Sequence, residues 1–194
     1  MPPRVRGAFP EHLKKDGTMA LVTPPSVRGL FRMQTVDVLF LCETNSATSL
    51  MAEALLNQRA DTRVRAFSAG SRPASALLPE AAQALTQRAI PTDGLEPKSW
   101  TIFALPGGLR PHIVVDLATV TWTEPDCARL AEYATLRWPL RDPALVERKA
   151  DRRAVTDTAL NALQTRISGE LMRRIDSVRQ AIDGEQSPAS RQWA

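Results

Sequence analysis

Short apolar runs alternate with helix-like spacings of apolar residues along the chain. The runs are typical of buried strands, and four of them stand out: Val36–Leu41, Arg63–Ser68, Ile113–Leu117 and Thr135–Leu140. The fourth run is weakened by Pro139, which lacks the backbone N–H that a strand uses in pairing. We therefore predict four strands.

Between and after these runs, apolar residues recur at intervals of three or four, as on one face of a helix. The clearest series extends from Leu160 to Ile182. Three shorter segments also have helical character: Ala47–Leu55, Pro79–Ala89 with proline in the first turn, and Glu124–Glu132. Strands that alternate with helices predict an α/β fold, in which a four-stranded parallel sheet is covered by helices on both faces.

The first 34 residues differ from the rest of the chain. They hold five of its 15 prolines and show no sustained periodicity, which is typical of irregular structure. We predict a basic, proline-containing extension over residues 1–34, a single folded domain over 35–184 and a polar tail over 185–194. Met19 and Met33 leave two further start positions open.

The net charge of the chain is concentrated in this extension. Residues 1–32 carry six Lys or Arg against two acids, and the whole chain has a formal net charge of +4. The other 162 residues are therefore balanced, with 19 basic and 19 acidic side chains. A balanced domain offers no basic face, so we expect no nucleic-acid partner.

Several further protein classes are disfavoured by the sequence. No apolar run approaches the roughly 20 residues of a membrane span, and we expect no signal peptide. Cys42 and Cys127 are far apart, which favours a reducing, cytoplasmic compartment over a disulfide framework. His12 and His112 have no zinc-ligand spacing, so we expect no metal and no cofactor. The sequence does not give the oligomeric state.

The turn after the first predicted strand is the strongest candidate for chemistry. It reads CETNSATS from Cys42 to Ser49, and ligands of parallel sheets bind beyond the carboxyl ends of the strands. A loop that enters a helix N-terminus turns its N–H groups toward an oxyanion and favours a thiolate at its first position. The alternative is a buried cysteine that ends a strand, with Ser46 capping the helix. The loop by itself leaves both interpretations open.

Four stretches of the chain carry a family resemblance: VLFLCETNSATSLMAEALL, FSAGS at 67–71, HIVV at 112–115 and WPLRDPA at 138–144. In this order and spacing they resemble the low-molecular-weight protein tyrosine phosphatases and the related thioredoxin-coupled arsenate reductases. The resemblance covers roughly residues 36–180. It implies a flavodoxin-like sheet and, as partner, a phosphate-like oxyanion or a phosphorylated substrate.

The resemblance also implies roles for single residues. Cys42 matches the nucleophile that forms a cysteinyl-phosphate, and Asp142 matches the acid that protonates the leaving oxygen and then activates water. Ser49 matches the serine that supports the thiolate, and Trp138 is expected to wall the substrate pocket. The expected phosphate-binding residues are Glu43, Thr44, Asn45, Ser46, Ala47, Thr48 and Ser49.

The loop departs from the family pattern at one position. The family has Cys, five residues and then Arg, but Thr48 stands in the place of that arginine. An arginine there would bind two phosphoryl oxygens and neutralise charge in the transition state. Glu43 adds a negative charge beside the thiol, so we expect only a modest lowering of its pKa. Arg72 and Arg141 are candidates to reach the pocket instead, although arginines ordinarily lie on the surface.

Two functions follow from this combination. The first is a divergent phosphatase that hydrolyses phosphomonoesters through Cys42 and Asp142 with weakened or redirected activity. The second is a non-catalytic module that keeps the pocket and binds an anion or a partner. A disulfide relay of the arsenate-reductase kind needs further cysteines, and only Cys127 remains, so we predict no relay.

Overall fold

A parallel sheet of four strands forms the centre of the computed structural model, which describes residues 35–59, 61–118 and 134–185. The strands are β1 (Val36–Cys42), β2 (Val64–Gly70), β3 (Ile113–Asp116) and β4 (Ala134–Arg137). They lie in the order β2-β1-β3-β4, and all neighbouring pairs are parallel. The predicted α/β fold with its four-stranded parallel sheet is therefore confirmed.

The fourth strand is shorter than expected, because it ends at Arg137 and not at Leu140. Beyond this end the chain still follows its neighbour: the N–H of Trp138 donates to Asp116 O at 2.7 Å, and that of Leu140 to Leu117 O at 3.1 Å. Pro139 stands between these two bonds and has no N–H to give. The interruption therefore ends the regular strand without turning the chain away from the sheet.

The first two helices and the long C-terminal helix stand where they were predicted, with differences in length, whereas a short third helix was not predicted. The helices before β3 are α1 (Thr48–Asn57), α2 (Pro79–Thr86) and the short α3 (Thr101–Ala104). After β4 come a single 3-10 turn, η1 (Pro143–Leu145), and then three consecutive segments: α5 (Lys149–Arg166), the π-helical η2 (Ile167–Leu171) and α6 (Met172–Glu185). The predicted C-terminal helix is thus present, but it begins at Lys149 and not near Leu160.

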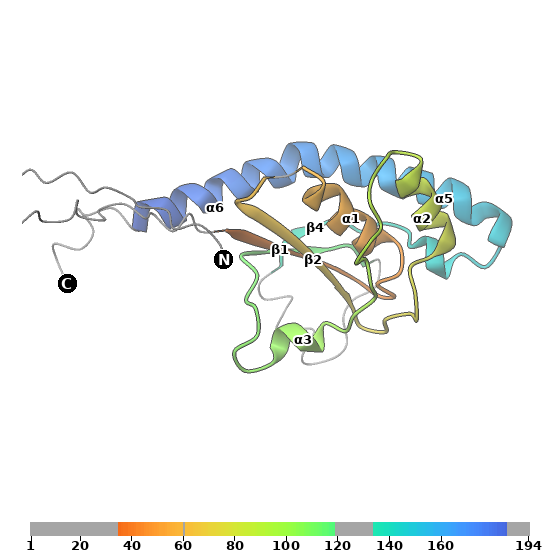
Figure 1. Ribbon diagram of the computed structural model, residues 1–194, viewed down its shortest axis with the longest axis horizontal. Helices are drawn as coiled ribbons and strands as arrows, with labels where there is room; N and C mark the ends of the chain where they lie inside the picture. The colour runs from red at the N-terminus through yellow and green to blue at the C-terminus, as the bar shows by residue number, and fades with distance from the viewer. Residues whose placement is uncertain (1–34, 60, 119–133, 186–194) are drawn as a thin grey trace, which may run out of the picture. The chain divides into compact units, whose positions relative to one another are not determined.

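The two faces of the sheet are covered by different parts of the chain. Side chains of β1 at Val36, Val38 and Phe40 pack into a cluster with α1, α2 and the long C-terminal helix. Leu39 and Leu41 point the other way, into a smaller cluster with residues in and near α3. Figure 1 shows this arrangement, with the long helix on one side of the sheet and α3 on the other.

The carboxyl ends of the strands meet at one edge, where the candidate loop begins. Cys42 at the end of β1 pairs with Gly70 at the end of β2, and Leu41 pairs with Asp116 at the end of β3. The loop of residues 43–47 leads from this edge into α1 (Figure 1). The sheet thus brings the ends of three strands to the loop.

Some predictions lie outside the described residues: the extension 1–34, the helix Glu124–Glu132 with Cys127, and the tail beyond residue 185. None of the helices that the structure describes is long and apolar enough to cross a membrane. Within the same residues, no group of three or more His, Cys, Asp or Glu side chains is placed to hold a metal ion.

Candidate functional site

The backbone of the loop after β1 has its carbonyl groups on the outside. Three of them accept hydrogen bonds of 2.8–2.9 Å from backbone N–H groups of the segment after β2: Glu43 O from Arg72, Thr44 O from Ala74 and Ser46 O from Leu78. In a trans peptide the N–H of the next residue points away from the carbonyl. The loop N–H groups therefore turn inward, and that of Asn45 donates to Cys42 Sγ at 3.2 Å. The result is a cradle of backbone donors around the thiol, suited to an oxyanion.

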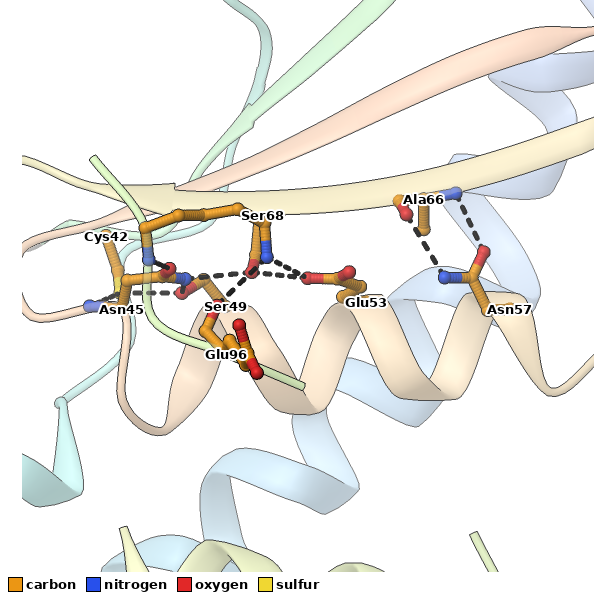
Figure 2. Close-up of polar contacts among 9 residues, drawn as sticks. Cys42, Asn45, Ser49, Glu53, Asn57, Ala66, Ser68 and Glu96 are labelled. Atoms are coloured by element: carbon orange, nitrogen blue, oxygen red, sulfur yellow. Dashed lines mark hydrogen bonds and ion pairs between the residues drawn. The ribbon is translucent and has the colours of Figure 1, made fainter. Parts of the chain in front are cut away.

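Asn45 holds the cradle in this shape. Its φ of 44° lies in the left-handed region that asparagine tolerates better than most residues. Its side-chain N–H₂ donates to Ser49 Oγ and to Ser68 Oγ, each at 2.8 Å, and its Oδ1 accepts from the N–H of Lys98 at 2.7 Å. Figure 2 shows the amide between Ser49 of α1 and Ser68 of β2. One fully buried side chain thus joins the loop to three other segments.

Gly70 provides the space that the loop needs beside β2. A Cβ at this position would lie 2.8 Å from the carbonyl oxygen of Glu43 and 2.9 Å from the Cβ and backbone N of Asn45. Real Cβ atoms do not approach backbone so closely. The glycine that follows FSA in the sequence is therefore required by the close contact of β2 with the loop.

Ser49 connects the asparagine to the thiol. Its Oγ lies 2.9 Å from Cys42 Sγ. Because Asn45 already donates to this oxygen, the hydroxyl hydrogen remains available for the sulfur. Sγ can then receive two hydrogen bonds, from Ser49 and from the N–H of Asn45, an arrangement that supports a thiolate.

The thiol nevertheless favours its neutral form. Cys42 is only 1% exposed, and this burial raises the pKa of its thiol. The negative charge of Asp142 raises the pKa further. The hydroxyls of Ser49 and Thr48 and the backbone N–H of Ser49 act in the opposite direction but do not outweigh burial. The expected modest lowering of this pKa is therefore wrong, because burial of the sulfur outweighs the hydrogen bonds that the loop and α1 provide.

Glu43 is not an isolated negative charge beside the thiol. Its carboxylate forms an ion pair with the guanidinium of Arg72, which follows β2. Arg141, the other arginine considered from the sequence, lies on the surface near Asp142. The repulsion expected from Glu43 is thus offset by a neighbouring cation.

Thr48 occupies the position of the family arginine at the first turn of α1. It is fully buried, and its Oγ1 has no hydrogen-bond partner in the part of the chain that the structure describes. The hydroxyl lies near enough to Cys42 to lower the thiol pKa, so it can donate to the sulfur once the thiolate forms. An unpartnered buried hydroxyl costs about 1–3 kcal/mol, which a bound anion or the thiolate would recover.

Asp142 reaches the loop from the segment between β4 and η1, 98 positions from Thr44 in the chain. Its Oδ2 accepts a hydrogen bond of 2.9 Å from Thr44 Oγ1, and its Oδ1 accepts one of 3.0 Å from the N–H of Ala144 in η1. Burial raises the pKa of this carboxyl, although the hydrogen bonds from Ala144 and Thr44 oppose the rise. A carboxyl that keeps its proton more readily than usual is suited to act as a general acid.

Trp138 lies beneath the long helix in this structure. It is 2% exposed, its indole N–H donates to Glu170 Oε2 at 2.9 Å, and the guanidinium of Arg166 is 5.8 Å from its ring centre. These contacts are with the helix and not with the loop. Its role as a wall of the substrate pocket stays a prediction.

Sequence reasoning missed a buried carboxylate behind the loop. Glu53 of α1 is 8% exposed, accepts a hydrogen bond from Ser68 Oγ and lies 3.5 Å from the ammonium of Lys98. Figure 2 shows it beyond Ser68, in line with Asn45. A signal was present, because Ser49 and Glu53 are four apart and so share one face of α1.

Comparison with known proteins agrees with this geometry. A family model described as low molecular weight phosphotyrosine protein phosphatase matches residues 37–106, which include the loop and Gly70. No curated protein sequence matches the chain.

Solved structures share the fold at low sequence identity. A thioredoxin-dependent arsenate reductase of Corynebacterium glutamicum has a TM-score of 0.51 and 24% identity, covering 75% of this chain; the chain spans 64% of that reductase. An arsenate reductase in the phosphate-binding state has a TM-score of 0.55 and 19% identity, and the match covers 72% of this chain and 98% of that reductase. A low molecular weight protein tyrosine phosphatase from T. tengcongensis has a TM-score of 0.52 and 21% identity, and the match covers 72% of this chain and 99% of that phosphatase.

Proposed function

We propose that the loop binds a phosphate-like oxyanion and slowly hydrolyses phosphomonoesters, since the chain belongs to the low-molecular-weight phosphotyrosine protein phosphatase family. The site would act through a cysteinyl-phosphate on Cys42. Its inward N–H groups, those of Thr44, Asn45 and Ala47, supply donors for the anion. The two cysteines of the chain favour the cytoplasm as its place of action.

The observation that carries the proposal is that both reactive groups are fixed to the same loop. Ser49 holds the sulfur of Cys42 at 2.9 Å, and Thr44 holds the carboxyl of Asp142 at 2.9 Å. In the first step the thiolate would attack phosphorus while Asp142 gives its proton to the leaving oxygen. In the second step the carboxylate would take a proton from the water that cleaves the S–P bond.

Two features make this reaction slow. Thr48 offers one neutral hydroxyl where the family loop has a guanidinium. Loss of even a single electrostatic stabiliser costs about 3–4 kcal/mol, or 10²–10³ in rate. The raised pKa of Cys42 adds to this, because only a small fraction of the thiol is ionised near pH 7.

The second candidate function is a non-catalytic module that binds an anion or a partner through the same pocket. The raised thiol pKa and the burial of Cys42 favour it, since binding needs the backbone donors but no nucleophile. The two functions share the cradle and differ only in whether the sulfur reacts.

Turnover of an aryl phosphate distinguishes them. We expect slow turnover by the full chain that falls to background in Cys42→Ser and in Asp142→Asn. Cys127→Ser, a matched loss of the other cysteine, should keep the parent rate. Calorimetry with inorganic phosphate on the same proteins measures binding separately. Equal background rates in the parent and Cys42→Ser, with phosphate still bound, would replace the phosphatase by the binding module.

A further inference from the structure

An arginine does lie at the loop, although it does not come from the loop sequence. Arg72 follows the end of β2 by two residues. Its backbone N–H donates to Glu43 O at 2.9 Å, and its guanidinium pairs with the Glu43 carboxylate. Two contacts to one residue, the neighbour of Cys42 in the chain, hold Arg72 beside the loop.

The two partners of this ion pair differ in their access to solvent. The side chain of Glu43 is 16% exposed, whereas that of Arg72 is 76% exposed. A guanidinium has five N–H donors, and a carboxylate engages at most two of them well. Arg72 therefore keeps donors and positive charge for a second anion that arrives from solvent.

We propose that Arg72 is the anion-binding cation of this site, and that Glu43 competes with the bound anion for it. The inference rests on the proposed function, because it presumes that the loop binds an oxyanion. Arg72 would take one or two non-bridging oxygens of a phosphate from the rim, while the loop N–H groups bind from below. Glu43 would lower the affinity for the anion, since an incoming anion must either share Arg72 with Glu43 or displace Glu43 from it.

This arrangement makes a prediction that simple repulsion by Glu43 does not make. If Glu43 acts only through its own charge, its removal strengthens phosphate binding whether or not Arg72 is present. If Glu43 acts by occupying Arg72, its removal strengthens binding only when Arg72 is present. The two substitutions are then coupled, and a double-mutant cycle measures the coupling.

The test is calorimetry of inorganic phosphate binding at low ionic strength, with the full chain and three variants. We expect Arg72→Gln to weaken binding about fivefold and Glu43→Gln to strengthen it about fivefold, the size typical of a largely exposed charge pair. The double variant should bind like Arg72→Gln. Arg110→Gln, an equal change of charge before β3 at the opposite edge of the sheet, should bind like the parent.

Three results would overturn the inference. An equal gain from Glu43→Gln in the presence and absence of Arg72 would reduce Glu43 to a repelling charge. An unchanged affinity in Arg72→Gln, with a loss in Arg141→Gln, would assign the cation to the other arginine. Absence of phosphate binding in the parent and in every folded variant would refute the proposed function together with this inference, whereas binding that ignores Arg72 refutes the inference alone.

Discussion

The hydroxyl of Thr44 donates a hydrogen bond of 2.9 Å to Oδ2 of Asp142, a residue 98 positions away in the chain. This contact places the carboxyl on the loop whose first residue is the cysteine. Thr44 Oγ1 is also 2.9 Å from Ser46 Oγ, so the hydroxyl is held on both sides. The acid and the loop are therefore one hydrogen-bonded unit.

Thr44→Val should raise the pKa of Asp142. The lost hydrogen bond stabilises the carboxylate form. Without it, only the N–H of Ala144 opposes the rise in pKa that burial causes. Carbon-13 chemical shifts of the aspartate carboxyls against pH report this titration. Thr44→Ser keeps a hydroxyl and serves as the control; equal titration of Asp142 in the valine and serine variants would show that the hydrogen bond does not matter.

Alkylation of Cys42 against pH should have a midpoint above the ordinary thiol value of about 8.5, because burial and Asp142 raise its pKa. A Cys127→Ser background isolates the reaction. Asp142→Asn removes the negative neighbour, so it should move the midpoint to lower pH. Asp151→Asn, a loss of the same charge in the first turn of α5, should not move it. A midpoint near pH 6 in the parent would refute this account of the thiol.

Replacement of Asn45 should separate the cost of its hydrogen bonds from that of its backbone. Asn45→Ala and Asn45→Gly lose the same side-chain contacts to Ser49, Ser68 and Lys98. Only alanine is also strained at a φ of 44°, so its free energy of unfolding should be about 1 kcal/mol below that of the glycine variant. Urea unfolding measures both. A glycine variant no more stable than the alanine one would mean that the loop relaxes to another conformation.

Thr48→Val should leave the free energy of unfolding unchanged or raise it by up to about 1 kcal/mol. The change removes a buried hydroxyl that has no partner among the described residues, while the shape of the side chain is kept. The pKa of Cys42 should rise further, because the hydroxyl can no longer donate to the thiolate. A destabilisation of 2 kcal/mol or more, about the cost of a lost buried hydrogen bond, would show that the hydroxyl has a partner.

The central strands β1 and β3 could be predicted from the sequence because they are buried on both faces. Every residue of β1 is buried, so an unbroken apolar run was enough to find it. The first half of the long helix could not be found in this way. Residues 149–158 are mostly polar, and their helix is fixed by packing on α2 and by contacts such as that of Arg153 with Gln83. The four-residue α3 is too short to show a period.

The residues of the loop and Asp142 were predicted from the resemblance, and the structure brings them together. Their electrostatics were not predictable, because they depend on residues distant in sequence. Arg72 offsets the charge of Glu43, and burial raises the pKa of Cys42. Neither the Arg72–Glu43 ion pair nor the burial of Cys42 can be recognised from the spacing of residues in the loop.

Restoring the arginine tests whether the cradle lacks only that group. Thr48→Arg places a guanidinium on the first turn of α1, and Glu43→Val removes the competing carboxylate and frees Arg72. Thr48→Met, a larger and unbranched side chain without charge, controls for the filling of a buried position. Thermal unfolding of each variant confirms that it is folded before its rate is compared.

We predict that Thr48→Arg combined with Glu43→Val hydrolyses an aryl phosphate at least about a hundredfold faster than the parent, the order of one electrostatic stabiliser. Thr48→Met should show no gain. Addition of Cys42→Ser should abolish the gain, which ties it to the sulfur and not to a contaminating phosphatase. A folded double variant that binds inorganic phosphate no better than the parent and turns over no faster would contradict the account, and the loop would then not be a phosphatase site that lacks its cation.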